Sequence, residues 1–232
     1  GTDALLLPLK ALELQPGDEV IVPAFTFFAS AGAVANAGGT PVFVDIDPAS
    51  FNLSPAAVEA VITPRTRAIV VVHLFGQMAP IEAILALAER RGIPVIEDAA
   101  QAIGARRRIG GQWRMAGELG WVGTFSFFPT KNLGGYGDGG MILTSDPSTA
   151  GRLARLRLHG GAKQYHHDEI GTNSRLDSLQ AAVLLAKLPY LAGWSAARRE
   201  RAARYATGLA DLAGIQTPGT DPENEHIFHQ YT

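Results

Sequence analysis

Residues 80–101, PIEAILALAERRGIPVIEDAAQ, join the pattern of an amphipathic helix to that of a buried strand. After Pro80, apolar residues recur at helical spacing along one face: Ile81, Ile84, Leu85 and Ala88. Arg90 and Arg91 suit the negative end of a helix dipole, and Gly92 is typical of a helix stop. The next run is apolar and partly β-branched, which favours a buried strand. A helix that leads into such a strand is typical of a parallel sheet covered by helices.

The same alternation of strands and helices extends on both sides of this stretch. Upstream, the pattern predicts strands at 19–22, 41–44 and 68–74, and helices at 28–37 and 54–62. Downstream, it predicts helices at 176–188 and 196–209. We therefore expect an α/β fold in which helices cover a mostly parallel sheet.

A second informative stretch, FSFFPTKNLG at 125–134, sets one lysine between an apolar run and a glycine-rich turn. An apolar run before a turn indicates a buried strand, so we expect Lys131 where a strand leaves the core. Burial depresses the pKa of an ammonium group, and a neutral lysine forms Schiff bases with aldehydes. The alternative is an ordinary surface lysine.

The predicted strand at 93–96 ends in two carboxylates, Glu97 and Asp98. Open α/β sheets bind ligands at the carboxyl ends of their strands, where Asp98 is expected to lie. A carboxylate there can hold a proton on the pyridine nitrogen of pyridoxal phosphate, which makes the ring an electron sink. The alternative roles of Asp98 are a helix cap and a metal ligand. No cluster of His or Cys lies nearby in the sequence to support a metal site.

The first residues, Gly1-Thr2-Asp3, precede an apolar run and predict the start of a helix that Thr2 or Asp3 can cap. Backbone N–H groups at a helix start can bind phosphate. An ordinary helix cap explains the same residues.

Seven motifs in order carry a family resemblance: GTDAL (1–5), VPAFTF (22–27), FVDID (43–47), VHLFG (72–76), EDAAQ (97–101), SFFPTKNLG (126–134) and GTNSRLD (171–177). This series resembles the sugar-nucleotide aminotransferases of the DegT/DnrJ type, which are pyridoxal-phosphate enzymes with the aspartate-aminotransferase fold, called fold type I. The resemblance covers the chain from its first residue to its last. It implies a transaminase rather than a dehydratase, because the dehydrating members carry histidine where this chain has Lys131.

The resemblance also implies roles for individual residues. Lys131 would form a Schiff base with the cofactor and shuttle a proton, and Asp98 would pair with the pyridine nitrogen. Phe27 would stack on the ring, and Gln101 would lie near the 3-hydroxyl group. The phosphate would be held by Gly1, Thr2, Asp3 and Ser126, and Asn173 would reach the phosphate of the neighbouring subunit's cofactor.

The implied partners follow from the same resemblance. The enzyme would transfer an amino group, with glutamate as the expected donor, to a nucleotide-linked keto sugar for polysaccharide, lipopolysaccharide or antibiotic biosynthesis. The homodimer would have shared active sites. The sequences at 127–140 and 165–167 are similar to those of members that act at C3 of hexuluronic-acid sugars. Amination at C3 or C4 of 6-deoxy keto sugars stays open.

The resemblance predicts a large pyridoxal-phosphate-binding domain at 1–210 and the start of a small C-terminal domain at 211–232. Family members have a segment before the phosphate-binding helix and a complete small domain. We therefore expect this chain to lack parts that the family's members contain.

Composition narrows the class of protein. The formal net charge of −2 gives no general attraction to nucleic acid, and the absence of cysteine excludes disulfides and thiol catalysis. Neither a signal peptide nor a run long enough to span a bilayer is recognisable. We expect a cytoplasmic protein without nucleic-acid or membrane partners.

Four further features have simple explanations. GYGDGG at 135–140 matches a dinucleotide-binding pattern, but a strand-like run follows it, so we expect a tight turn beside the cofactor. The sequence HHDE at 166–169 is expected to be a loop near the substrate rather than a metal site. The arginine run 106–108 is expected to be exposed. His73 either faces the site or is a core histidine with satisfied hydrogen bonds.

Overall fold

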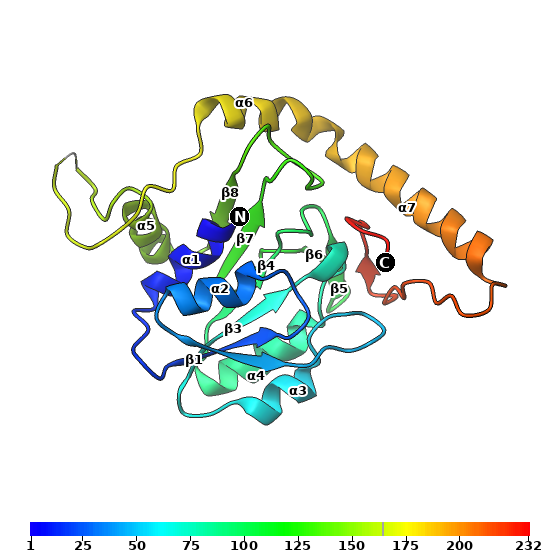
Figure 1. Cartoon of the computed structure of the whole chain (residues 1–232), viewed down its shortest axis with the longest axis horizontal. Coiled ribbons are helices and arrows are strands. Elements are labelled where there is room, and N and C mark those ends of the chain that lie inside the picture. Colours follow the sequence, from blue (N-terminus) through cyan, green and yellow to red (C-terminus); the bar gives the residue numbers. More distant parts are fainter. Residues whose placement is uncertain (164) are drawn as a thin grey trace.

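The computed structural model describes residues 1–163 and 165–232 and contains a six-stranded sheet of order β2-β1-β3-β4-β7-β8 (Figure 1). Five strands are parallel and the edge strand β8 is antiparallel to β7. Their bounds are β1 (Glu19–Pro23), β2 (Thr40–Val44), β3 (Thr66–Val72), β4 (Val95–Asp98), β7 (Val122–Ser126) and β8 (Gly140–Leu143). The predicted α/β fold with a mostly parallel sheet is confirmed.

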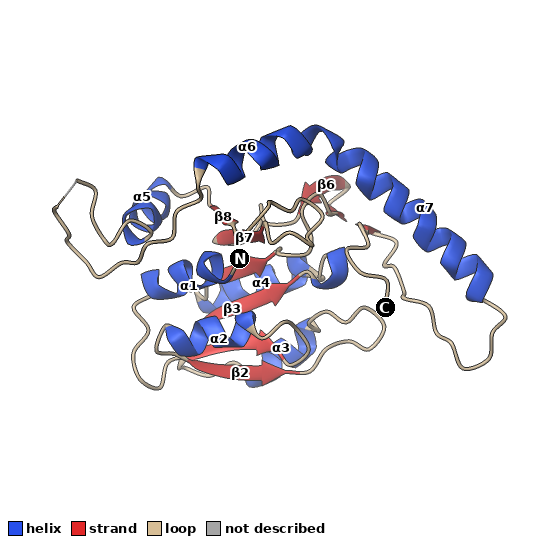
Figure 2. Ribbon diagram, turned by 45° about the horizontal axis from the view of Figure 1, so that its top comes forward, coloured by secondary structure: helices blue, strands red, loops and turns tan. Residues whose placement is uncertain are grey.

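Helices cover both faces of this sheet (Figure 2). Alternate strand residues point to opposite faces, so Val20 and Val22 enter one apolar cluster while Ile21 enters the other. The first cluster also receives side chains from α1 (Thr2–Ala11), α2 (Ala29–Asn36) and α5 (Pro147–Leu156). The second receives them from α3 (Pro55–Val61) and α4 (Ile81–Arg91). The result is a three-layer α/β/α arrangement.

The helix α4 begins and ends where its sequence predicts. Its last turn carries Arg90 and Arg91, and Gly92 follows in the left-handed conformation with φ of 63°. A residue with a side chain adopts this conformation less readily, which is why glycine stops the helix here.

Two further helices, α6 (Ser178–Lys187) and α7 (Leu191–Leu209), form a long arm across the top of the views in Figures 1 and 2. A 3₁₀ turn at Leu188–Tyr190 joins them. Leu184 is the buried residue of α6, and Ser195 and Ala202 are those of α7. Most of this arm is therefore exposed in the described chain. Among the helices of the described residues, none combines the length and apolar composition that a bilayer crossing requires.

A second, antiparallel sheet has the order β6-β5-β9 and consists of β5 (Arg106–Ile109), β6 (Gln112–Met115) and β9 (Asn224–Glu225). It corrects the expectation that the arginine run is exposed, because Arg107 is buried. Its guanidinium donates to both carboxylate oxygens of Glu82 at 2.8–3.2 Å and to Asp221 at 2.6 Å. This network fastens a C-terminal segment to α4, and the domain boundary at residue 210 stays a prediction.

Three predicted boundaries differ from the structure. The strand expected at 68–74 ends at Val72, because Phe75 (φ 57°) and Gly76 (φ 97°) turn the chain within a 3₁₀ helix at Leu74–Gly76. The strand before Lys131 ends at Ser126, so Lys131 lies in the following loop rather than at the strand end. The helix expected from residue 196 begins earlier, because the 3₁₀ turn before Leu191 continues directly into it.

Candidate active site

The carboxyl ends of the central parallel strands carry the predicted chemistry. Asp98 is the last residue of β4, and Ser126 is the last residue of the neighbouring β7. Lys131 follows in the loop after β7, and its backbone N–H donates to the Phe128 carbonyl at 2.9 Å. The strand order therefore brings residues distant in sequence to one edge of the sheet.

Asp98 is buried and held by two hydrogen bonds. Its Oδ2 accepts from the Ser30 hydroxyl at 2.9 Å, and its Oδ1 accepts from the backbone N–H of Ala100 at 3.1 Å. Burial raises the pKa of Asp98, and these hydrogen bonds and the Lys131 charge partly offset that rise. The positive charge of Lys131 lowers the pKa of Asp98 because it favours the ionised carboxylate.

The Lys131 ammonium is partly buried. Burial lowers its pKa, and the negative charge of Asp98 acts in the opposite direction. Lys131 and Asp98 each influence the pKa of the other, in the sense expected for opposite charges at one edge of the sheet. A partly buried amine with a depressed pKa is suited to bond to an aldehyde carbon.

The start of α1 lies against the end of β7. A Cβ atom added to Gly1 would lie 2.7 Å from Ser126 Oγ, so glycine permits this close approach. The predicted cap is wrong: Gly1 occupies the cap position, and neither Thr2 nor Asp3 makes a capping hydrogen bond. The first intrahelical bond runs from Ala4 N to Gly1 O at 2.9 Å, so the N–H groups of Thr2 and Asp3 precede it.

Gln101 and Phe27 lie on the surrounding loops. Gln101 Oε1 accepts from the backbone N–H of Phe75 at 2.7 Å, which ties Gln101 to a residue in the left-handed conformation. Phe27 precedes α2, and 72% of its surface is exposed. A large aromatic side chain exposed beside a cluster of polar groups can cover a flat ligand.

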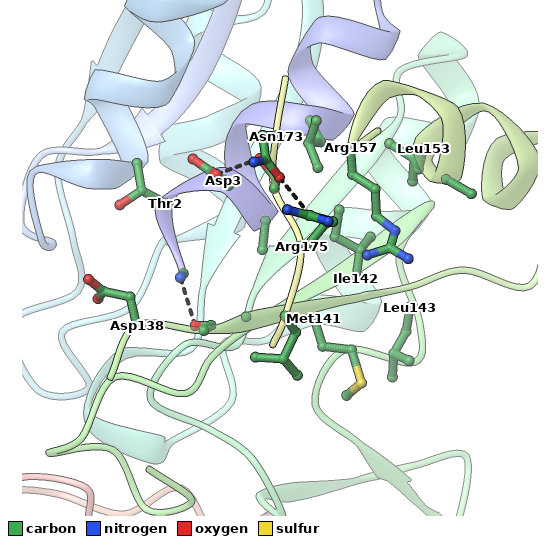
Figure 3. A pocket seen from close by; sticks show the side chains of 18 of the residues that line it. Thr2, Asp3, Asp138, Met141, Ile142, Leu143, Leu153, Arg157, Asn173 and Arg175 are labelled. Atoms are coloured by element: carbon green, nitrogen blue, oxygen red, sulfur yellow. Dashed lines mark hydrogen bonds between the residues drawn. The ribbon is translucent and has the colours of Figure 1, made fainter. Parts of the chain in front are cut away.

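Asn173 lines a cavity of about 720 Å³ together with Gly1, Thr2 and Asp3 (Figure 3). Asn173 Oδ1 accepts from Arg175 Nε at 3.0 Å, and the Ser174 hydroxyl donates to Asp3 Oδ2 at 2.5 Å. The described lining does not include five of the predicted residues, namely Phe27, Asp98, Gln101, Ser126 and Lys131. The predicted set thus forms two neighbouring groups, which the contact between Gly1 and Ser126 connects.

Three residues beside the site were missed from the sequence. Ser30 lies in a helix of small residues, ASAGAVAN at 29–36, where nothing marks one serine as a partner of Asp98. Asn132 and His229 are 97 positions apart, and Asn132 Oδ1 lies 2.7 Å from His229 Nδ1. Burial, and then the charge of Lys131, lowers the pKa of His229 to about 4. Only the folded chain brings these groups together.

The structure also bears on three other sequence motifs. His73 is fully buried with hydrogen bonds on both ring nitrogens, so it is a satisfied core histidine. The strand β8 follows the 135–140 glycines, which confirms that a dinucleotide-binding helix does not follow them. Within residues 1–163 and 165–232, no group of three or more metal-ligating side chains is present.

Comparison with known proteins gives a family for this geometry. The model of the DegT/DnrJ/EryC1/StrS aminotransferase family matches residues 1–232. The chain is 53% identical over 234 residues to a "Pleiotropic regulatory protein" of Geobacillus stearothermophilus. It is 52% identical over 232 residues to a UDP-N-acetyl-3-dehydro-alpha-D-glucosamine 3-aminotransferase of Acidithiobacillus ferrooxidans. Both matches cover 100% of this chain and 62% of the relative.

A solved structure agrees with these matches. The crystal structure of DesV from S. venezuelae in complex with a ketimine intermediate superposes with a TM-score of 0.94 and 48% identity. The match covers 99% of this chain and 61% of DesV. The chain therefore spans about three fifths of the length of the proteins that it resembles.

Proposed function

Since the chain belongs to the DegT/DnrJ/EryC1/StrS aminotransferase family, we propose that it provides the cofactor site of an enzyme that aminates a nucleotide-linked keto sugar. Membership confirms the resemblance seen in the sequence. The observation that carries the proposal is the presence of a partly buried Lys131 and a buried Asp98 at the same edge of the sheet, after and at the ends of the neighbouring strands β7 and β4.

The residues present fit pyridoxal phosphate as the cofactor. The buried Asp98 offers an anion for a protonated ring nitrogen, and Lys131 offers an amine. The close approach of Gly1 to Ser126 puts a helix N-terminus next to a serine, which suits a phosphate group. The exposed ring of Phe27 suits stacking on a flat heterocycle.

Each residue then has a separate task. Pyridoxal phosphate, when bound, supplies an aldehyde that takes up an amine and a ring that accepts an electron pair. Lys131 holds the cofactor through Nζ and moves a proton at the substrate carbon that carries the nitrogen. Asp98 keeps a proton on the ring nitrogen, and Gln101 orients the ring hydroxyl. Phe27 covers one face of the ring.

The phosphate is held at the sheet edge by Ser126 and by the first residues of α1, Gly1, Thr2 and Asp3. These residues supply N–H and hydroxyl donors that anchor the cofactor while the amine is exchanged. Anchoring at the phosphate leaves the Lys131 end of the site available for proton transfer.

A sugar nucleotide with a keto group at C3 is the proposed substrate. The name of the Acidithiobacillus relative, a 3-aminotransferase acting on a UDP-linked 3-dehydro sugar, supports this carbon and this nucleotide class. We propose glutamate as the amino donor. We also propose a cytoplasmic location, and a chain without cysteine is compatible with that reducing compartment. Amination at C4 is the alternative outcome of the substrate screen.

The proposed assembly is a homodimer with shared sites. Its support is the position of Asn173, whose side chain lines the cavity beside the start of α1 and not the surroundings of Lys131. A residue placed there can serve a second copy of the chain. The exposed apolar side chains of α6, including Leu179 and Leu185, supply surface for such contact.

A regulatory protein is the second candidate, because one relative is named a pleiotropic regulator. A regulator that only binds the cofactor has no need of the acid–base lysine. This chain has both Lys131 and Asp98, which favours the enzyme.

The test is a two-step reaction with the full chain. Protein loaded with pyridoxal phosphate is mixed with glutamate, and the release of 2-oxoglutarate is measured by mass spectrometry. A UDP-linked 3-keto sugar is then added, and the amino sugar is sought. The proposal expects both products in wild type and neither with Lys131→Ala. A protein that binds cofactor and yields neither product would favour the regulator.

A further inference from the structure

The most completely buried ionisable pair outside the proposed cofactor contacts is formed by His73 and Glu97. Both side chains have 0% exposure, and His73 Nε2 lies 2.9 Å from Glu97 Oε2. His73 follows β3 directly, and Glu97 is the penultimate residue of β4, next to Asp98. A buried pair of this kind adds little net stability compared with apolar residues of similar size, so its presence calls for another explanation.

The hydrogen bonds define which nitrogen of His73 carries the proton. His73 Nδ1 accepts from the backbone N–H of Ala79 at 3.1 Å, so this nitrogen must present a lone pair. The proton of the neutral ring is therefore on Nε2, which donates to Glu97. His73 thus links the loop at Ala79 to β4.

Glu97 collects three more donors from one turn. Its Oε2 accepts from Gly117 N at 2.9 Å, and its Oε1 accepts from Leu119 N at 2.7 Å and Gly120 N at 2.5 Å. Burial alone would raise the pKa of Glu97, but the His73 hydrogen bond and the backbone donors of Gly120 and Gly117 bring it below its ordinary value. The ionised carboxylate therefore fastens β4 to the turn that precedes β7.

The same elements fix the backbone around Asp98. His73 N donates to Asp98 O at 3.0 Å, and Ala99 N donates to Thr124 O at 2.9 Å. Thr124 Oγ1 donates to the Glu97 carbonyl at 3.0 Å. Neighbouring side chains on a strand point to opposite faces, so Glu97 anchors β4 from the face opposite to the Asp98 carboxylate.

We propose that His73 and Glu97 form a positioning pair that sets the place of the Asp98 carboxylate under the ring nitrogen of the cofactor. The inference rests on the proposed function, since it gives Asp98 the ring-nitrogen role. His73 and Glu97 do not touch the cofactor. They act through the backbone of β4, so their loss moves Asp98 without removing its charge.

Two substitutions at one position separate positioning from general stability. His73→Asn keeps an acceptor for Ala79 N but is too short to reach Glu97, whereas His73→Gln keeps a donor that can reach Glu97. Each loses one hydrogen bond of the histidine, so their thermal midpoints are expected to fall by similar amounts. Glu97→Gln weakens the same contact between His73 and residue 97, because it removes the negative charge of the carboxylate that accepts from His73.

The readouts are the Kd for pyridoxal phosphate and the pH midpoint of the visible absorbance of the loaded full chain. We expect His73→Asn and Glu97→Gln to weaken binding about tenfold, the effect of about 1.4 kcal/mol, and to raise the pH midpoint. The pH midpoint rises for the following reason. When the ring nitrogen is protonated less of the time, the ring withdraws less electron density from Lys131 Nζ, the bonded nitrogen whose titration changes the absorbance. His73→Gln is expected to keep both values close to wild type.

Arg107→Met is the matched control, since it breaks another ion network, formed by the buried Arg107 and two partly exposed carboxylates of the chain. It is expected to lower the thermal midpoint and leave both readouts unchanged. Wild-type Kd and pH midpoint in His73→Asn, or in Glu97→Gln if the first variant does not fold, would overturn the positioning role. An equal loss of affinity in Arg107→Met would also overturn it. Failure of wild type to bind pyridoxal phosphate would instead overturn the proposed function.

Discussion

The Ser30 hydroxyl lies 2.9 Å from Asp98 Oδ2 and donates a hydrogen bond to it across 68 positions of sequence. Both side chains are buried, and Thr26 Oγ1 lies 3.2 Å from Ser30 Oγ. A donor aimed at a carboxylate favours the ionised form. The helix α2 therefore contributes to the charge of the residue that is proposed to hold the ring-nitrogen proton.

The first prediction concerns this hydrogen bond. Ser30→Ala removes a donor to a buried charge, and such bonds contribute about 1.5–3 kcal/mol. We expect binding of pyridoxal phosphate to weaken about tenfold or more, as measured by titration of absorbance. Ser54→Ala is the control, because Ser54 precedes α3 without a side-chain capping bond. Equal affinities in wild type and Ser30→Ala would contradict this role for Ser30.

The second prediction concerns the pKa of Lys131 in the protein without cofactor. Burial lowers this pKa, and the Asp98 anion acts against the lowering. Asp98→Asn removes the anion, so the pKa of Lys131 should fall further and more of the amine should be neutral at a given pH. The pH dependence of Lys131 acetylation, followed by mass spectrometry, should shift to lower pH. An unchanged or opposite shift, judged against Glu89→Gln, would show that the two charges do not interact.

The third prediction concerns the stability of the C-terminal segment. The Arg107 side chain is 7% exposed, and its partners Glu82 and Asp221 are 38% and 36% exposed. Breaking a fully buried pair costs about 3–5 kcal/mol, and partial solvent access of the carboxylates reduces this to about 2 kcal/mol for Arg107→Met. Urea unfolding measures the difference. The exposed Arg108 provides the control, Arg108→Met, for which a comparable loss would rule out the buried network as the cause.

The fourth prediction concerns acid sensitivity. Burial lowers the pKa of His226 to about 4 from 6.5, so the folded protein keeps it neutral while the unfolded chain takes up a proton. His226 therefore contributes stability that is fully present above pH 6.5 and is lost as the pH falls toward 4. The loss amounts to about 3 kcal/mol at most.

The variant that checks this dependence is His226→Asn, whose side-chain oxygen can still accept from Phe228 N. The slope of unfolding free energy against pH between 6.5 and 4.5 should become shallower in this variant. His166→Asn, at an exposed position, is the matched control, and an equal change of slope in this variant would rule out His226 as the cause. Carboxylates with lowered pKa values, such as Glu97, respond mainly below this range.

Local patterns were sufficient to predict the α4–β4 unit. The apolar spacing of α4, its terminal arginines and Gly92 act within a few residues of one another, so the sequence shows them directly. Asp98 and Lys131 were recognisable for a related reason, since each is a charged residue beside an apolar run. The seven ordered motifs then supplied the family, which composition and spacing alone did not.

Contacts between distant residues were not predictable in this way. Ser30 and Asp98 meet only because α2 packs on the face of the sheet to which Asp98 points, and Arg107 is buried only because Glu82 and Asp221 surround it. His73 could be a site residue or a core residue until the position of Glu97 was known. The capping prediction for Thr2 and Asp3 was wrong because both residues lie within the first turn of α1, after the cap position at Gly1.

The most direct test of the central claim is to trap the bond between Lys131 and the cofactor. The full chain is incubated with pyridoxal phosphate, reduced with borohydride, digested and analysed by peptide mass spectrometry, with Lys131→Arg as the control. We expect a phosphopyridoxyl group on the peptide that contains Lys131, and none on that peptide in the control. Folded wild-type protein without a label on Lys131, or with equal labelling of other lysines, would show that Lys131 does not hold the cofactor.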